Sequence, residues 1–331
     1  MEIGQWLRGL GLQSYEQAFR DNGIDLGVLT RLTADDLKEI GVVAVGLAEP
    51  GAVIIADGTR RLVGDLFELS ELAPTALKGF AEPVRAWRVL GEGRAESRFQ
   101  AMHGTRLTPL VGRGEELDFL LSRWQQAREG SGQVVLLSGE AGIGKSRLVL
   151  SLCERLHDEP KATVSYSCSP HHIHSALFPF MSQLERSVGF LAADTSGTRL
   201  GRLELFLRET VEEPDDALAL FADLLGISIG PRSQLDAMSP LQKKWILFRT
   251  FLAQLERLSV GRPVLIVLED AHWLDPTSRE LFDQIVDRLQ RLPVLLVVTF
   301  RPALSPPWTG FAYVTLLTLN RLTQQQAQLL V

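Results

Sequence analysis

The residues best suited to chemistry in this sequence form a short run that fits the pattern G-x-x-x-x-G-K-[ST]. Its members, in chain order, are Gly139, Glu140, Ala141, Gly142, Ile143, Gly144, Lys145 and Ser146. Glycines at this spacing let the backbone curl so that successive N–H groups face phosphate oxygens. In such a loop the lysine reaches the outer phosphates of a nucleotide, and the serine hydroxyl ligates Mg²⁺. The run therefore predicts a site for a nucleoside triphosphate and its magnesium ion.

An acidic pair is the second candidate, because Glu269 and Asp270 directly follow the apolar run VLIVL. At the end of a buried strand, one carboxylate can hold the metal while its neighbour orients the attacking water. We expect Glu269 to bind Mg²⁺ together with Ser146, and Asp270 to polarise the water. Asp before Glu is the commoner order for such a pair, so the sequence leaves open which of the two faces the metal. An acidic pair in this position can also be no more than a helix N-cap.

Arg301 is the third candidate, since it directly follows an apolar run that ends in VVTF. A basic residue at the end of the strand beside the acidic pair can sense the γ-phosphate, which would add Arg301 to the catalytic set of Glu269 and Asp270. The alternative, given equal weight, is a solvated arginine that opens the next loop.

Histidines and cysteines offer no comparable site. His171, His172 and His174 resemble a metal tract, yet no cysteine or carboxylate lies at a matching spacing, so we interpret them as a solvent-facing loop. Cys153 and Cys168 are interpreted as two ordinary buried thiols rather than a disulfide or a zinc site.

The segment from residue 107 onward supplies the elements that must position these groups. An amphipathic helix with Leu117, Leu120, Leu121 and Trp124 on one face is expected first. Helical segments then alternate with four apolar runs that we predict as strands: residues 134–138, 162–168, 264–268 and 294–298. Such alternation favours a parallel sheet with helices on both faces. The expected fold is therefore α/β, of the kind that carries a phosphate-binding loop.

Two segments with different sequence patterns precede this one, so we expect a multidomain chain. Residues 1–46 have apolar side chains at helical spacing and predict a small helical module. Residues 47–91 predict short strands and turns of an α+β kind, with strands near 52–57, 66–69 and 84–90. Residues 92–106 are polar, contain glycine and are expected to be a linker before the domain of residues 107–331.

Composition limits the classes of partner. Hydrophobic residues make up 45% and charged residues 22% of the 331, which favours a globular protein over a disordered one. A net charge of -6 argues against a general nucleic-acid or anionic-membrane surface. The longest apolar runs fall far short of the ~20 residues that span a bilayer, and we find no signal peptide at the N-terminus. We therefore expect a cytoplasmic protein with no membrane partner.

Residues 107–331 resemble the ATPase module of the STAND and AAA-like class of large bacterial signalling proteins. The matching segments, besides the glycine-rich run, are LVGRGEEL (110–117), SPHHIHSALFPF (169–180), SPLQKK (239–244) and LEDAHWLDPTS (268–278). The resemblance implies ATP as the nucleotide and Mg²⁺ as its cofactor. It also implies that Val111, Gly112 and Arg113 lie near the adenine and ribose, although Gly114 stands where this class usually has glutamate.

The preceding residues resemble two other families. Residues 1–46, with WLRGLGLQSYEQAF and LTADDLKEIGV, are similar to a SAM domain that lacks its long final helix. Residues 47–91, with AEPGAVIIADGTRRLVGDLFEL and LKGFAEPVRAWRVL, resemble the C-terminal end of a class III adenylate/guanylate cyclase domain. Only the last ~45 residues of such a ~180-residue domain are found. Its metal-binding carboxylates have no counterpart, so we expect no cyclase activity. The lid subdomain and helical repeats of such proteins are likewise missing before Val331.

These observations lead to one expected function and two alternatives. We expect an ATP- and Mg²⁺-binding signalling module of a cyclase-like regulator, with slow ATP hydrolysis at best and a protein partner bound through the SAM-like residues. One alternative is a SAM-mediated interaction protein with a vestigial ATPase. The other is a transcription-regulator-type ATPase, against which the acidic net charge speaks.

Overall fold

The computed structural model describes residues 16–22, 24, 52–64, 67–74, 83–92, 110–191, 194–210, 214–228, 238–305 and 308–328. The chain divides into two compact units, Met1–Gly104 and Thr105–Val331, which are considered separately. Most of the predicted SAM-like module and of the predicted linker lies outside the described residues.

The first unit contains a small antiparallel sheet. Its described elements are α2 (Glu16–Asp21), β1 (Val53–Ala56), α5 (Asp57–Val63), β2 (Phe67–Glu71) and β3 (Ala86–Glu92). The strands lie in the order β1-β3-β2, and a bulge interrupts β2 between Glu68 and Leu69. Trp87 of β3 is buried, and the guanidinium groups of Arg60 and Arg85 lie 5.3 and 5.4 Å from its ring. The three strands were predicted, whereas the short helix α5 was not.

The second unit is built on a five-stranded parallel sheet. Its strands are β4 (Gln133–Ser138), β5 (Ala162–Ser167), β6 (Val264–Glu269), β7 (Val294–Phe300) and β8 (Val314–Thr318). They lie in the order β5-β6-β7-β4-β8, and every neighbouring pair is parallel. The predicted α/β fold with a parallel sheet is confirmed. The edge strand β8 was missed, because it is only half-buried and its apolar pattern is weak.

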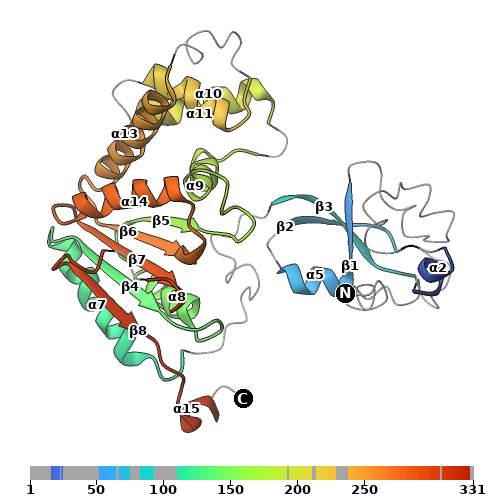
Figure 1. The fold of residues 1–331 in the computed structure, drawn as a ribbon, viewed down its shortest axis with the longest axis horizontal. Coiled ribbons are helices and arrows are strands. Elements are labelled where there is room, and N and C mark those ends of the chain that lie inside the picture. Colours follow the sequence, from blue (N-terminus) through green and yellow to red (C-terminus); the bar gives the residue numbers. More distant parts are fainter. Residues whose placement is uncertain are drawn as a thin grey trace. The chain divides into compact units, whose positions relative to one another are not determined.

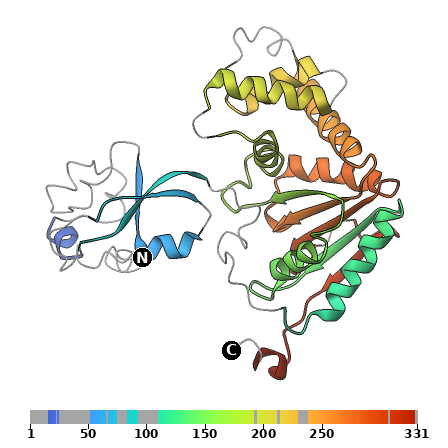
Figure 2. The same ribbon diagram turned by 180° about the vertical axis from the view of Figure 1, so that it is seen from behind.

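Helices cover both faces of this sheet (Figures 1 and 2). Two of them, α7 (Gly114–Arg128) and α8 (Lys145–Arg155), pack on one face. The other face is covered by α9 (Phe178–Val188), α13 (Pro240–Leu258) and α14 (Pro276–Leu289), beside which α10 (Ser196–Thr210) and α11 (Pro214–Leu224) pack. The short elements η4 (Ala271–Trp273) and α15 (Gln324–Gln328) complete the unit.

Alternation along the central strands divides the core into two layers. Val134 and Leu136 of β4 face the layer of α9, α13 and α14, whereas Val135 and Leu137 face the layer of α7 and α8. All four side chains are fully buried, because successive residues of a strand point to opposite faces and helices cover both. Burial of this apolar surface stabilises the fold by about 25 cal/mol per Å².

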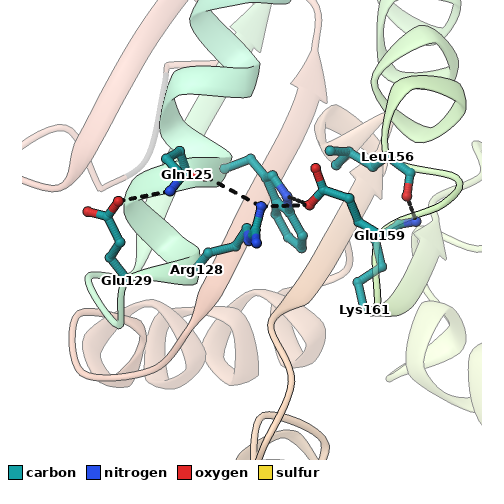
Figure 3. Close-up of polar contacts among 7 residues, drawn as sticks. Gln125, Arg128, Glu129, Leu156, Glu159 and Lys161 are labelled. Atoms are coloured by element: carbon teal, nitrogen blue, oxygen red, sulfur yellow. Dashed lines mark hydrogen bonds and ion pairs between the residues drawn. The ribbon is translucent and has the colours of Figure 1, made fainter.

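Polar contacts join the end of α7 to the turn that follows α8 (Figure 3). Glu159 accepts hydrogen bonds from the Trp124 indole at 2.8 Å and from Arg128 at 3.1 Å, both at the same oxygen. Exposed ion pairs of this kind contribute at most about 1 kcal/mol. The Trp124 side chain, only 2% exposed, contributes more by packing. Together these contacts hold α7 beside α8, the helix that follows the glycine-rich loop.

Within the described part of the chain, no helix combines the length and the apolar character needed to cross a bilayer.

Gly132 offers a test of how tightly the sheet packs against α14. A Cβ atom at this position would lie 1.8 Å from the backbone oxygen of Leu289, at the end of α14. We expect Gly132→Ala to lower the free energy of unfolding by about 3 kcal/mol, because neither backbone can give way cheaply. Urea denaturation of the full chain, followed by circular dichroism, would measure the change.

Gly201→Ala is the matched control. This position lies within α10 with nothing inside 4 Å of its added Cβ, so the substitution should stabilise the helix by up to about 1 kcal/mol. Equal effects of the two substitutions would contradict the close approach at Gly132.

Candidate functional site

The glycine-rich run forms the turn between β4 and α8. Gly142 and Gly144 have φ angles of 75° and 102°, in the left-handed region where a side chain is strained. Gly144 is also the N-cap residue of α8, which begins at Lys145. The turn therefore needs its two later glycines to reach the helix, and the N–H groups at the helix N-terminus give it the anion-binding character predicted from the sequence.

Lys145 lies folded across this turn. Its ammonium donates hydrogen bonds to the backbone oxygens of Gly139 at 2.7 Å and Glu140 at 2.9 Å, and the residue is only 8% exposed. Burial lowers the pKa of Lys145, while the negative charge of Asp270 opposes that effect. The lysine charge is thus held close to the turn and within electrostatic range of the acidic pair.

The two predicted metal ligands lie together. Glu269 is the last residue of β6 and is 8% exposed, and the Ser146 side chain lies near its carboxyl group. Burial, aided by the charge of Asp270, raises the pKa of Glu269 to about 7, and the nearby Ser146 side chain works against this rise. A carboxyl group so poorly solvated is suited to a bound cation, which would restore its charged form.

Asp270 has an unusual backbone. Its φ angle of 57° is in the left-handed region, which costs a residue with a side chain of order 1 kcal/mol or more. Its N–H donates to the Thr299 hydroxyl at 3.0 Å, and Thr299 is a fully buried residue of β7. This bond ties the acidic pair to the neighbouring strand. Thr299 was not predicted, although it is the one polar residue within VLLVVTF.

Arg301, directly after β7, lies on an aromatic side chain. Its guanidinium carbon is 5.2 Å from the centre of the Trp273 ring, and the His272 ring lies 4.2 Å from that same tryptophan. Arg301 is close enough to Lys145 and His272 for its charge to lower the pKa of both. Neither His272 nor Trp273 was predicted as a site residue, although both lie with the acidic pair in the segment LEDAHWLDPTS.

Asp275 links the acidic pair's loop to the loop that follows β5. One of its carboxylate oxygens caps α14 by accepting from the N–H groups of Thr277 at 3.0 Å and Ser278 at 2.9 Å. The same oxygen accepts from the N–H of Leu177 at 3.3 Å. In the loop before Leu177, His172 stacks on Phe178 with ring centres 3.7 Å apart.

The residues predicted to lie near the base directly precede α7. Arg113 is 6% exposed and donates to Glu116 at 2.8 Å, to the backbone oxygen of Ile143 at 3.3 Å and to that of Asn320 at 2.5 Å. These bonds connect the residue before α7 to the glycine-rich turn and to the segment that follows β8. A nucleotide contact for Val111, Gly112 and Arg113 stays a prediction.

The site as a whole gathers complementary groups at one edge of the sheet. The residues come from the ends of three neighbouring strands, β4, β7 and β6. They provide a backbone turn for phosphates, two cations, a buried carboxyl paired with a hydroxyl, and a second carboxyl that is partly exposed: Lys145, Arg301, Glu269, Ser146 and Asp270. This donor set fits a phosphorylated ligand that carries a divalent cation.

Two known families match the sequence. The AAA ATPase domain matches residues 109–298, and the SAM domain (sterile alpha motif) matches residues 1–49. An uncharacterized protein of Rhizobium meliloti is 32% identical over 285 residues, which are 86% of this chain. This chain spans only 27% of that relative's length.

Several solved structures share part of the fold at low similarity. Cdc6p from Pyrobaculum aerophilum is 18% identical over 67% of this chain and 49% of its own, with a TM-score of 0.36. C. elegans PCH-2 is 14% identical over 63% of this chain and 43% of its own, with a TM-score of 0.34. Drosophila ORC bound to DNA is 13% identical over 66% of this chain and 45% of its own, with a TM-score of 0.32. Similarity this low says nothing about what the present chain binds.

The raised pKa of Glu269 predicts a pH-dependent stability for the magnesium-free protein. Because the folded value of about 7 exceeds the ordinary 4.5, the folded state is favoured below pH 4.5, and this contribution is lost as the pH rises through 7. At about 1.4 kcal/mol per pKa unit, the loss is up to about 3 kcal/mol. We expect Glu269→Gln to remove it, so that the variant unfolds at higher urea than the wild type above about pH 7.

Urea midpoints measured from about pH 5 to pH 8 test this expectation. Glu115→Gln, which changes an exposed carboxylate on α7, is the matched control and should follow the wild-type profile. Identical profiles for Glu269→Gln and the wild type would show that the Glu269 carboxyl is not buried as described.

Proposed function

We propose that this chain, which belongs to the AAA ATPase domain family, binds ATP with Mg²⁺ and hydrolyses it slowly as the nucleotide-dependent module of a larger signalling protein. One observation carries the proposal: the Ser146 side chain of the glycine-rich turn lies close enough to the buried Glu269 carboxyl, at the end of β6, to favour its charged form. A hydroxyl and a carboxyl from elements more than a hundred residues apart meet where a nucleotide-bound cation would need both.

Binding of the phosphates falls to the turn and to Lys145. The backbone N–H groups at the start of α8 supply fixed donors for phosphate oxygens. Lys145 exchanges its two hydrogen bonds with Gly139 and Glu140 for bonds to the outer phosphates. Because the ammonium is already buried and held at the turn, this exchange needs only a local change of rotamer.

Ser146 and Glu269 are the residues that would hold the magnesium ion. The bound ion supplies positive charge that offsets the negative charge of the phosphate oxygens. Glu269 would be ionised with a cation in place, since the cation would stabilise the negative charge that burial disfavours. The Ser146 hydroxyl, which lies near Glu269, would be the second ligand.

Asp270 is the residue proposed to polarise the attacking water. Its side chain is 37% exposed, so water reaches it, and the bond from its N–H to Thr299 fixes its position. Arg301, held on Trp273, contributes positive charge toward the developing charge on the transferred phosphate. We propose slow turnover because the acidic pair has the reverse of the commoner order.

The remaining segments are proposed to serve regulation. The match of residues 1–49 to the SAM domain family supports a protein partner for that segment. Residues 47–91 are proposed to be the end of a class III cyclase domain, without cyclase activity, and their described strands form a small antiparallel sheet consistent with an α+β remnant. The role within a whole protein is likewise a proposal, because this chain spans about a quarter of the length of its curated relative.

Lys145→Ala tests nucleotide binding. Removal of the ammonium deprives the outer phosphates of two charge-assisted hydrogen bonds, so we expect the Kd for Mg·ATP to rise at least about 100-fold. Calorimetric titration of the full chain measures the constant. Lys243→Ala, which removes a lysine on α13, is the control and should bind as the wild type does. If the folded wild type gave no heat with Mg·ATP, the interaction-module alternative would replace this proposal.

Asp270→Asn separates hydrolysis from binding. A neutral amide cannot polarise water as a carboxylate does, so phosphate release should fall about 100-fold or more. The Kd for Mg·ATP should stay within about threefold of the wild-type value, since Asp270 is not proposed to hold the metal. Unchanged phosphate release would assign the water to another group, with Glu269 next in line.

A further inference from the structure

His272 is a polar side chain with unmet hydrogen-bonding capacity beside the proposed phosphate site. Its imidazole is only 11% exposed, and neither ring nitrogen has a hydrogen-bond partner among the described residues. Nδ1 lies 4.0 Å from the nearest Asp270 carboxylate oxygen, too far for a hydrogen bond. An imidazole buried in this way costs free energy unless a partner arrives.

The surroundings of His272 indicate what kind of partner fits. Lys145, Arg301 and Asp270 all lie within electrostatic range of the ring. Two of these three groups are cations, so the missing partner is expected to be an anion rather than a further cation. Burial and the two cations lower the pKa of His272, so that the ring is neutral and offers one N–H donor. A phosphate oxygen accepts from such a donor.

Trp273 holds the two groups that would meet this anion. The His272 ring lies 4.2 Å from the Trp273 ring at an angle of 42°, and Arg301 lies over the same indole. Neither His272 nor Arg301 is oriented by a hydrogen bond among those described. A rigid aromatic ring therefore positions both, and no hydrogen bond among the described residues competes for the His272 ring nitrogens.

We propose that His272 donates a hydrogen bond to the terminal phosphate of the bound nucleotide and thereby sets a preference for triphosphate over diphosphate. Trp273 is the positioning residue, because both His272 and Arg301 lie against its ring. This inference rests on the proposed nucleotide site and adds a specificity-determining residue to it. The inner phosphates remain with the glycine-rich turn, so their binding does not depend on His272.

Calorimetric titrations with Mg·ADP and with the Mg²⁺ complex of the non-hydrolysable β,γ-imido analogue of ATP test the inference. For His272→Ala in the full chain, we expect the Kd of the analogue to rise about tenfold or more and the Kd of Mg·ADP to change less than about twofold. His272→Gln keeps a donor and should stay within about threefold of the wild type for both ligands. His157→Ala, at an exposed histidine after α8, should change neither.

Other variants keep the result interpretable. His272→Leu fills the space without a donor, so it should reproduce the selective loss even if His272→Ala folds poorly. Trp273→Leu should lower the same selectivity, by about threefold. Equal weakening of both ligands, or no weakening of either, would overturn the role of His272. If the wild type bound neither ligand, the proposed function itself would fail, whereas equal affinity of the wild type for both ligands would overturn only the role of His272.

Discussion

Parallel pairing of β4, β7 and β6 governs the chemistry of this chain, because it brings the carboxyl ends of three strands to one edge of the sheet. In this register Ser138 lies opposite Phe300, and Leu268 lies opposite Val298. The glycine-rich turn, Arg301 and the acidic pair each follow directly from one of these ends. A slip of one residue in any strand would turn its core side chains toward the wrong layer, so the packing that stabilises the sheet also fixes the site.

Several charged and polar groups of the site have incomplete electrostatic or hydrogen-bonding partners in the folded chain. Lys145 rests on backbone oxygens, the Glu269 carboxyl is poorly solvated, and His272 has no hydrogen-bond partner among the described residues. Each of these groups gains a better partner if phosphates and a cation occupy the edge of the sheet. Burial costs free energy while these groups lack partners, and the same low-dielectric surroundings strengthen their contacts with a ligand.

Sequence periodicity predicted the central strands and the segments that surround the site, because a strand buried on both faces appears as an unbroken apolar run. The G-x-x-x-x-G-K-[ST] pattern identified Lys145 and Ser146 as candidate site residues. The apolar run VLIVL identified Glu269 and Asp270, which directly follow it. Periodicity did not reveal the edge strand β8 or the short helix α5, whose patterns are weak. It also could not reveal Thr299, Trp273 or Asp275 as positioning residues, since their contacts join loops that are far apart in the sequence.

The left-handed backbone of Asp270 has a consequence for the entropy of association. Its φ angle of 57° is maintained in the folded chain by the bond to Thr299, within a core that is already packed. The strain is therefore compensated during folding, and the backbone from which this carboxylate extends is fixed before any encounter with a ligand. Association then loses little backbone freedom at Asp270, and more of the contact free energy remains available as affinity.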